Sequence, residues 1–139
     1  MSRLLVVDHD VMIDGGQHHD LQELFAEANE RYFGGGVRAT IVWGPARRPR
    51  RRKKFTFANH YLRRRLIIVN RALDARWVPR FVMAFLVFHE MLHSVCRPRR
   101  EGGRSIVHTP EFVEREKAHH SYARAMAWEA KNLDRLLRS

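Results

Sequence analysis

The pattern of hydrophobic positions changes along the chain from helical spacing to alternation, which predicts a mixture of helices and strands. In the first helical segment, Asp20 can cap a helix, and Glu23 three positions later completes a capping box. Apolar residues then recur on one helical face, at Leu21, Leu24, Phe25, Ala28 and Tyr32. Three consecutive glycines at 34–36 should end this helix. The preceding residues, 1–19, show no pattern that assigns them to an element.

Three short segments after this helix have the character of strands. Residues 37–43 alternate around β-branched side chains, Phe55-Thr56-Phe57 starts a second strand, and residues 66–69 form a third. Gly44-Pro45 breaks the first strand, and Asn70 to Asp74 leads away from the third. We therefore predict a small antiparallel sheet of about three strands, from which residues 47–54 project as a loop.

A long apolar segment at 81–88 is hydrophobic on every side, which is typical of a helix buried in the core. Pro79 fits its first turn, and we expect the helix to run to about Val95. Residues 97–107 read as a loop. The fold class predicted from these elements is α+β, with the sheet packed against this core helix and its flanking helices.

Two further helices are expected after the loop. Thr109-Pro110-Glu111 combines a capping hydroxyl, an N-terminal proline and an acid in the first turn. His119 and His120 could bind a metal by composition, but paired residues at a helix junction more often form a turn, which is our interpretation. The last helix should cover 121–137, within a C-terminal segment 120–139, and bury Tyr122, Ala125, Trp128 and Leu133.

Composition limits the classes that need to be considered. A chain of 139 residues with 45% hydrophobic content suits a single domain spanning 1–139. One cysteine, Cys96, excludes an internal disulfide and a zinc site built from several thiolates. Cys96 could be a ligand, but a small buried hydrophobe is the simpler interpretation. The apolar run at the N-terminus is too short for a signal peptide, so we expect a cytoplasmic protein without a membrane partner.

The net charge of +11 is concentrated in the middle of the chain. Residues 38–104 carry 18 basic and 3 acidic side chains, whereas residues 1–37 carry 2 and 7. The densest stretch, here called the basic loop, comprises Arg47, Arg48, Arg50, Arg51, Arg52, Lys53 and Lys54. Charges this close repel one another unless a polyanion neutralises them, so we expect the basic loop to bind nucleic acid without base specificity.

The chemistry is concentrated in His89-Glu90-Met91-Leu92-His93 and in His108. Two histidines four positions apart on a helix point from one face and can share a tetrahedral metal, with the intervening glutamate beside it as a general base. His108, just before a capped helix, is the best third ligand. Three protein ligands leave a fourth position open for water, which is typical of a catalytic zinc site. The alternative is that these are ordinary histidines hydrogen-bonded to their neighbours.

These residues resemble the SprT-like zinc metalloproteases, the family that includes the DNA-dependent protease Spartan. The similarity covers roughly residues 20–115 and rests on HEMLH at 89–93, on His108-Thr109-Pro110-Glu111-Phe112 and on their spacing, together with the upstream order of helix, strand and Ile67-Ile68-Val69-Asn70. The resemblance implies a zincin-like fold, one Zn²⁺ bound by His89, His93 and His108, and Glu90 as the catalytic acid/base. It also implies proteolysis of proteins crosslinked to DNA.

The chain departs from this family at two points. Thr109 stands where a glycine often follows the third histidine, and the C-terminal zinc ribbon of many members has no counterpart here. We therefore expect a zinc-dependent endopeptidase acting on DNA-associated protein substrates, with DNA bound through the basic loop. Two alternatives stay open: a nucleic acid-binding module whose zinc is structural or vestigial, and a zinc peptidase that involves no nucleic acid.

Overall fold

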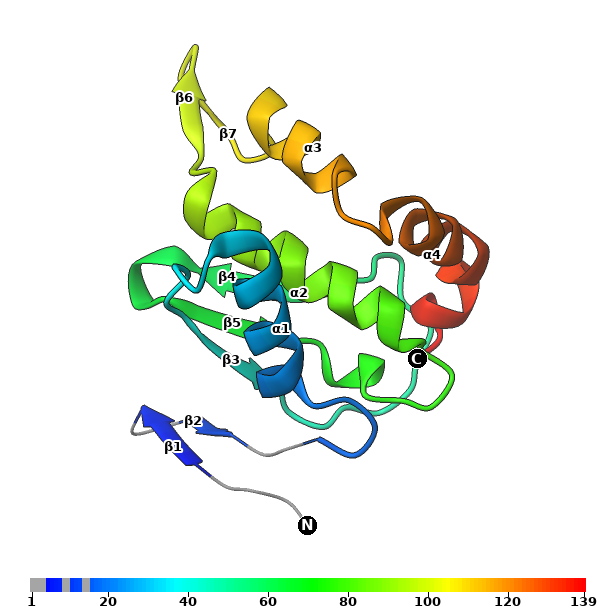
Figure 1. Ribbon diagram of the computed structural model, residues 1–139. Helices are drawn as coiled ribbons and strands as arrows, with labels where there is room; N and C mark the ends of the chain where they lie inside the picture. The colour runs from blue at the N-terminus through cyan, green and yellow to red at the C-terminus, as the bar shows by residue number, and fades with distance from the viewer. Residues whose placement is uncertain (1–4, 9–10, 14–15) are drawn as a thin grey trace.

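The structure, a computed structural model, describes residues 16–139 in full and the backbone of residues 5–8 and 11–13 (Figure 1). Residues 1–4, 9–10 and 14–15 therefore lie outside the described residues, and they include the start of the stretch used to argue against a signal peptide. In the described part of residues 1–19, β1 (Leu5–Asp8) pairs antiparallel with β2 (Val11–Ile13). The remainder of the chain folds as an α+β domain, as predicted.

The main sheet has three strands in the order β3-β5-β4, namely β3 (Thr40–Trp43), β5 (Leu66–Val69) and β4 (Ala58–Tyr61). β4 pairs antiparallel with β5, but β3 pairs parallel with it. The prediction of a purely antiparallel sheet was therefore wrong. The long connection 44–57 carries the chain past the position beside β3, so the next strand lies on the far side of β5. β5 is central and apolar at all four positions, as expected for a strand covered on both faces.

Two predicted strands were also misplaced at their ends. The first is limited to Thr40–Trp43 rather than 37–43, and the second begins at Ala58 rather than Phe55. Phe55 is buried in the core and packs edge-on against Phe57, with ring centroids 4.9 Å apart. Asn70 fixes the same segment, because its Nδ2 donates to the Thr56 carbonyl at 2.8 Å. Residues 55–57 are thus held by core packing and side-chain bonds rather than by strand pairing.

Helix α1 (Leu21–Phe33) begins and ends where the sequence predicts. The Asp20 carboxylate accepts the backbone N–H groups of Gln22 and Glu23, and Gly34 terminates the helix in the left-handed region at φ 58°. Asn29 then holds the segment that leads from α1 to β3, because its side chain donates to the carbonyl of Val37 and accepts the backbone N–H of the same residue. These bonds place β3 directly after the helix.

Helix α2 (Arg80–Val95) packs against α1, α3 (Pro110–Lys117) and α4 (Tyr122–Leu137). It ends at Val95 as predicted and buries ten of its sixteen side chains. Its apolar residues join one face of the sheet in the main core, together with the inward side chains of β3 and β5: Ile41, Trp43, Ile67 and Val69. The opposite face of the sheet carries a smaller cluster of Val42 and Leu66, with Ile68 packed against it.

Two predictions in the C-terminal half need correction. The expected loop at 97–107 contains a β-hairpin, β6 (Arg99–Glu101) with β7 (Arg104–Ile106), which projects from the body in Figure 1. Gly102 and Gly103 both adopt positive φ, which permits a two-residue turn between the strands. On α4, Ala125 is buried as expected, but Leu133 is 46% exposed, and Leu136 occupies the core instead.

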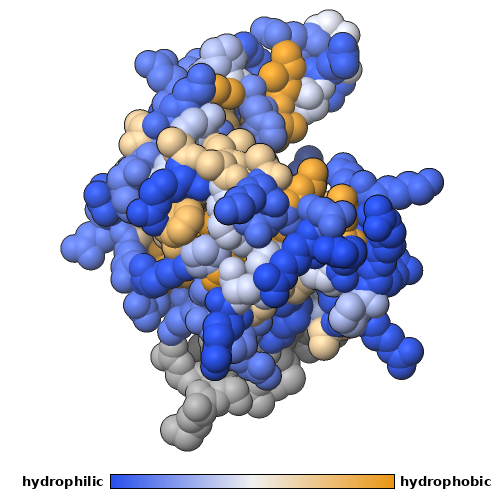
Figure 2. Space-filling view, turned by 90° about the vertical axis from the view of Figure 1, so that its right-hand side faces the viewer, coloured by the Kyte–Doolittle hydropathy of each residue, from blue (hydrophilic) through white to orange (hydrophobic). Residues whose placement is uncertain are grey.

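On the face drawn in Figure 2, hydrophilic side chains cover most of the surface, and hydrophobic ones gather around a notch between the upper part and the main body. Among the described residues, none of the helices has the length and hydrophobicity required to cross a bilayer.

The two faces of β5 provide a test of this packing. Ile67 is fully buried against the helices, whereas its neighbour Ile68 is only partly buried on the opposite face. We expect Ile67→Ala to lower the free energy of unfolding by about 2–5 kcal/mol in chemical denaturation. Ile68→Ala is the matched control and should cost less. Equal losses would contradict the assignment of the core to the Ile67 face.

Candidate metal centre

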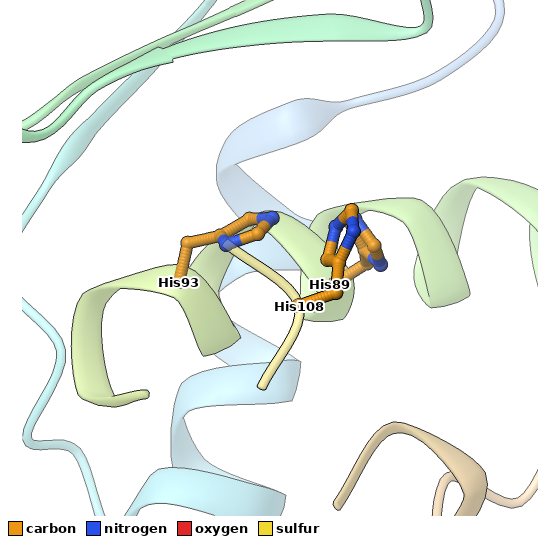
Figure 3. A group of neighbouring side chains, drawn as sticks. All are labelled: His89, His93 and His108. Carbon is orange, nitrogen blue, oxygen red and sulfur yellow. The ribbon is translucent and has the colours of Figure 1, made fainter. Parts of the chain in front are cut away.

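Three histidines converge at the C-terminal half of α2. His89 and His93 lie one turn apart on this helix, and His108 comes from the segment that leads into α3 (Figure 3). One ligand nitrogen from each residue lies within 4.8 Å of the other two. The ring centroids of the three pairs are 5.0, 5.4 and 5.1 Å apart. These three residues, here called the metal centre, can therefore hold a metal ion. The sequence predicted that they lie close together, and this proximity is confirmed.

The start of α3 holds His108 in place. Thr109 is buried, and its Oγ1 accepts the backbone N–H of Phe112 at 3.3 Å, which is the cap that the sequence predicts. Phe112 itself is fully buried, and its ring centroid lies 5.0, 4.4 and 5.0 Å from the rings of His89, His93 and His108. Because one aromatic ring contacts all three imidazoles, it fixes their relative positions.

Glu116, one helical turn beyond Phe112, supports His89. Its Oε2 bonds to Nδ1 of His89, which leaves Nε2 of that ring for a metal. A carboxylate behind a ligand imidazole fixes its orientation and makes the other nitrogen a stronger donor. Sequence reasoning missed Glu116. The signal was its position four residues after the apolar Phe112, which places the carboxylate on the inner face of α3.

The state of the three donor side chains fits a divalent cation, with His93 buried, His89 half-buried and His108 exposed. His93 is only 8% exposed, and its Nδ1 has no hydrogen-bond partner among the described residues. Burial, reinforced by the nearby His89, His108 and His60, lowers the pKa of His93 to about 3. Burial and the neighbouring His89 also lower the pKa of His108. Neutral imidazoles are the form that metals bind, so a dication can enter without displacing protons from these two rings.

Glu90 lies on the buried side of α2 and is 7% exposed. Burial raises the pKa of its carboxyl group, although the positive charge available on His89 opposes that shift. Glu90 also lies next to His60 on β4, whose Nδ1 is 3.8 Å from Oε1 of Glu90. Neither ring nitrogen of His60 has a hydrogen-bond partner among the described residues. Sequence reasoning missed His60, because only the alternation of β4 places it on the inner face.

A cavity of about 650 Å³ opens over these residues. The metal centre and Glu90 line it together with His60, Glu116 and Glu129. Apolar residues from α2, from α4 and from the positions that flank β4 complete the lining, among them Phe57, Leu62, Val82, Phe85 and Met126. Burial also raises the pKa of Glu129. This volume suits a small molecule or a few residues of an extended peptide, with polar groups concentrated at one place.

The basic loop lies away from the metal centre, at the C-terminal end of α4. Arg47 Nη2 and Arg52 Nη1 donate to the carbonyl of Ser139 at 3.2 and 2.5 Å, and the backbone N–H of Arg52 donates to the carbonyl of Leu137. Arginines at a helix C-terminus satisfy its free carbonyl groups and oppose the dipole. These two residues therefore fix the loop, whereas Arg48, Arg50, Arg51, Lys53 and Lys54 remain exposed. The sequence suggested that this loop projects freely from the sheet. The bonds to the end of α4 show that this prediction was wrong.

A second group of exposed cations lies near the metal centre. The hairpin β6–β7 connects the end of α2 to His108. Together with the two residues before it, the hairpin presents Arg97, Arg99, Arg100 and Arg104 at the surface. Arg99 pairs with Glu101 at 3.3 Å, and Arg100 donates to the carbonyl of Gly103.

Cys96 is not one of the candidate ligands. It is 7% exposed and packs with Phe88, Leu92 and Phe112 in a small apolar cluster below the metal centre. Its interpretation as a buried hydrophobe is confirmed. His119 and His120 likewise form the turn between α3 and α4, as predicted.

Comparison with known proteins adds no assignment, since no family model and no curated protein matches the chain.

Glu116 allows a direct test of the metal centre. Replacing Glu116 by Gln should lower zinc affinity by about 10- to 100-fold, because His89 loses the carboxylate that orients it. Competition against a chromophoric chelator measures this change. The control is Glu114→Gln, an exposed position on the same helix, which should leave affinity unchanged. Equal affinities in the two variants would exclude the supporting role of Glu116.

Proposed function

We propose that this protein is a zinc-dependent endopeptidase. One observation carries the proposal: three imidazoles that can bind a metal lie in the same cavity as a buried glutamate, next to the edge strand of a sheet. Each part has a use in peptide hydrolysis. The resemblance of the motifs to SprT-like proteases supports the same conclusion independently of the cavity.

The donor set favours zinc. Three imidazoles with no carboxylate or thiolate among the candidate ligands match the ligand preference of zinc in catalytic sites, where a fourth position stays open. Bound there, zinc would supply Lewis-acid chemistry, polarising a carbonyl oxygen and acidifying a water molecule.

Glu90 has the position and the chemistry of the general base. Its carboxylate lies in the cavity, on the same helix as two of the ligands, and burial raises its pKa towards the range useful for proton transfer. As water attacks the scissile carbonyl, Glu90 takes one proton and then delivers it to the departing amine nitrogen. His60, 3.8 Å from this carboxylate, limits the space in which Glu90 can move.

β4 offers a way to bind an extended polypeptide. It is an edge strand, with β5 on one side, and Ala58, Asn59 and His60 line the cavity. A substrate backbone could pair with its open edge, which would lay a peptide bond across the metal centre without requiring a particular side chain. This arrangement favours a peptidase over a hydrolase of small molecules.

We further propose that the protein substrates are associated with DNA. The exposed cations of the basic loop and of the β6–β7 hairpin form two surfaces that a phosphate backbone would neutralise. Since phosphate contacts carry no sequence information, binding should be independent of base sequence. The hairpin lies next to His108, so nucleic acid bound there would bring attached protein close to the cavity.

Glu90→Gln tests the proposed chemistry. The change removes the proton acceptor with little change in shape, so cleavage of an unfolded protein substrate should fall by about 100-fold or more. Zinc content, measured on the same sample, should stay near one per chain. Glu129→Gln is the matched control, because it changes another carboxylate of the same cavity and should retain activity.

Cleavage that persists in the Glu90 variant would contradict the assignment of Glu90 as the general base. Assays of the parent protein with and without single-stranded DNA distinguish three functions: a DNA-dependent peptidase, a peptidase that involves no nucleic acid, and a nucleic acid-binding module. Cleavage enhanced by DNA supports the full proposal, and cleavage indifferent to DNA indicates a peptidase without nucleic acid. DNA binding without cleavage indicates a binding module.

The basic loop can be tested through the salt dependence of DNA affinity. Replacing both Arg50 and Arg51 by Gln removes two exposed charges without affecting the bonds of Arg47 and Arg52 to Ser139. The slope of log affinity against log salt should decrease by about 1.4 for single-stranded DNA. Replacing Lys117 and Lys131 by Gln removes the same charge elsewhere and should leave the slope unchanged. Identical slopes in the two variants would rule out this loop as the DNA contact.

A further inference from the structure

A second cavity, of about 320 Å³, lies between α1, the start of α2 and the turn joining α3 to α4. It shares no lining residue with the cavity over the metal centre. Its apolar lining consists of Leu24, Ala28, Phe81 and Ala84, and its polar lining includes Arg31, Arg124, His119 and His120. The proposed peptidase chemistry uses none of these residues.

The hydrogen bonds of the two histidines determine which ring nitrogens carry hydrogen. The backbone N–H of Ser121 donates to Nδ1 of His119 at 3.0 Å, so this atom is an acceptor, and Nε2 carries the hydrogen of the neutral ring. The Tyr32 hydroxyl accepts the backbone N–H of His120 at 3.3 Å and lies 2.5 Å from Nδ1 of the same residue. It can donate its own hydrogen to that Nδ1, which again leaves Nε2 as the N–H.

These two imidazoles are held rigidly. The His119 and His120 rings stack with centroids 4.5 Å apart, and Tyr32 stacks on His119 at 4.9 Å. His119 is only 5% exposed and also contacts Phe88, at 4.7 Å. Both rings are therefore fixed donors at the wall of the cavity, with little rotational freedom left to lose on binding a ligand.

The cavity also has positive charge that the protein itself does not neutralise. Arg31 lies over the Tyr32 ring at 5.4 Å and Arg124 over the Phe81 ring at 4.0 Å. Within residues 16–139, neither forms an ion pair with a carboxylate. The third arginine, Arg80, differs, because it is paired with Glu27 at 2.7 Å and Glu23 at 3.2 Å. Glu27, the acidic residue in the lining, is thus paired with Arg80 and does not neutralise Arg31 or Arg124.

The positive charge of the two unpaired arginines contributes to lowering the pKa values of the two histidines. Burial, together with His120 and Arg31, lowers the pKa of His119 to about 4. Burial, Arg31 and Arg124 lower the pKa of His120. Both rings therefore stay neutral near pH 7 and act as N–H donors, while the two guanidinium groups supply the charge.

We propose that this cavity binds the phosphate group of a small organic phosphate. Two guanidinium groups match the charge of a phosphate monoester, and two further N–H donors suit its terminal oxygens. The volume exceeds what a single phosphate fills, and the apolar lining can accept the organic group attached to it. The site does not depend on the metal centre.

The test is a titration of the full chain with phenyl phosphate, followed by calorimetry and by NMR signals of the lining residues. Binding should weaken by about 10-fold or more in Arg124→Gln, which loses a charge-assisted contact. Arg135→Gln is the matched control, because Arg135 lies on the same helix and over the Trp77 ring at 4.1 Å, outside the cavity. It should bind phenyl phosphate as tightly as the parent protein.

Arg31→Gln, on α1, repeats the test without changing the packing of Arg124 on Phe81, and it should give a similar loss. Benzoate and inorganic phosphate serve as comparison ligands, and both should bind more weakly than phenyl phosphate. Benzoate binding equally tightly would overturn the assignment of a phosphate. Failure of phenyl phosphate to bind at millimolar concentration, or an equal loss in Arg135→Gln, would overturn the site itself.

Discussion

The convergence of three imidazoles on one point is the constraint on which the rest of this structure depends. Placing His93 and Glu90 among the apolar residues of α2 costs free energy unless these groups gain partners. Phe112 and Glu116, both from α3, provide contacts for the histidines but leave Nδ1 of His93 without a partner in the described chain. A bound cation would compensate for the burial of His93, because one of its ring nitrogens would then have a strong electrostatic partner. The capped start of α3 is what keeps the third ligand close to the other two.

Much of this site could be predicted from sequence because its parts are local. Caps at Asp20 and Thr109, the left-handed Gly34 and the apolar run of α2 each depend on a few adjacent residues, and all were placed correctly. The spacing of His89 and His93 follows from helical geometry alone. The contribution of His108 was also predicted, since a ligand just before a capped helix is held in a fixed position.

What sequence reasoning missed depends on distant pairing. Nothing local indicates that residues 44–57 cross to the far side of β5, which makes the sheet mixed and brings His60 beside Glu90. Glu116 reads as an ordinary helix carboxylate until α3 packs against α2. Arg47 and Arg52 belong to a run of charge, yet their side chains donate to the carbonyl of Ser139, because α4 ends beside them. Leu133 and Leu136 differ by less than one turn, and only tertiary packing decides which is buried.

The helix α2 thus separates two different chemical environments. One side has imidazoles and carboxylates suited to a cation, and the other has arginines and N–H donors suited to an anion. The most direct test of the central claim is X-ray absorption at the zinc edge on the purified, zinc-loaded protein. The account predicts three imidazole nitrogens and one oxygen at about 2.0–2.1 Å. A sulfur neighbour, or a zinc ion with only one or two imidazoles, would contradict it.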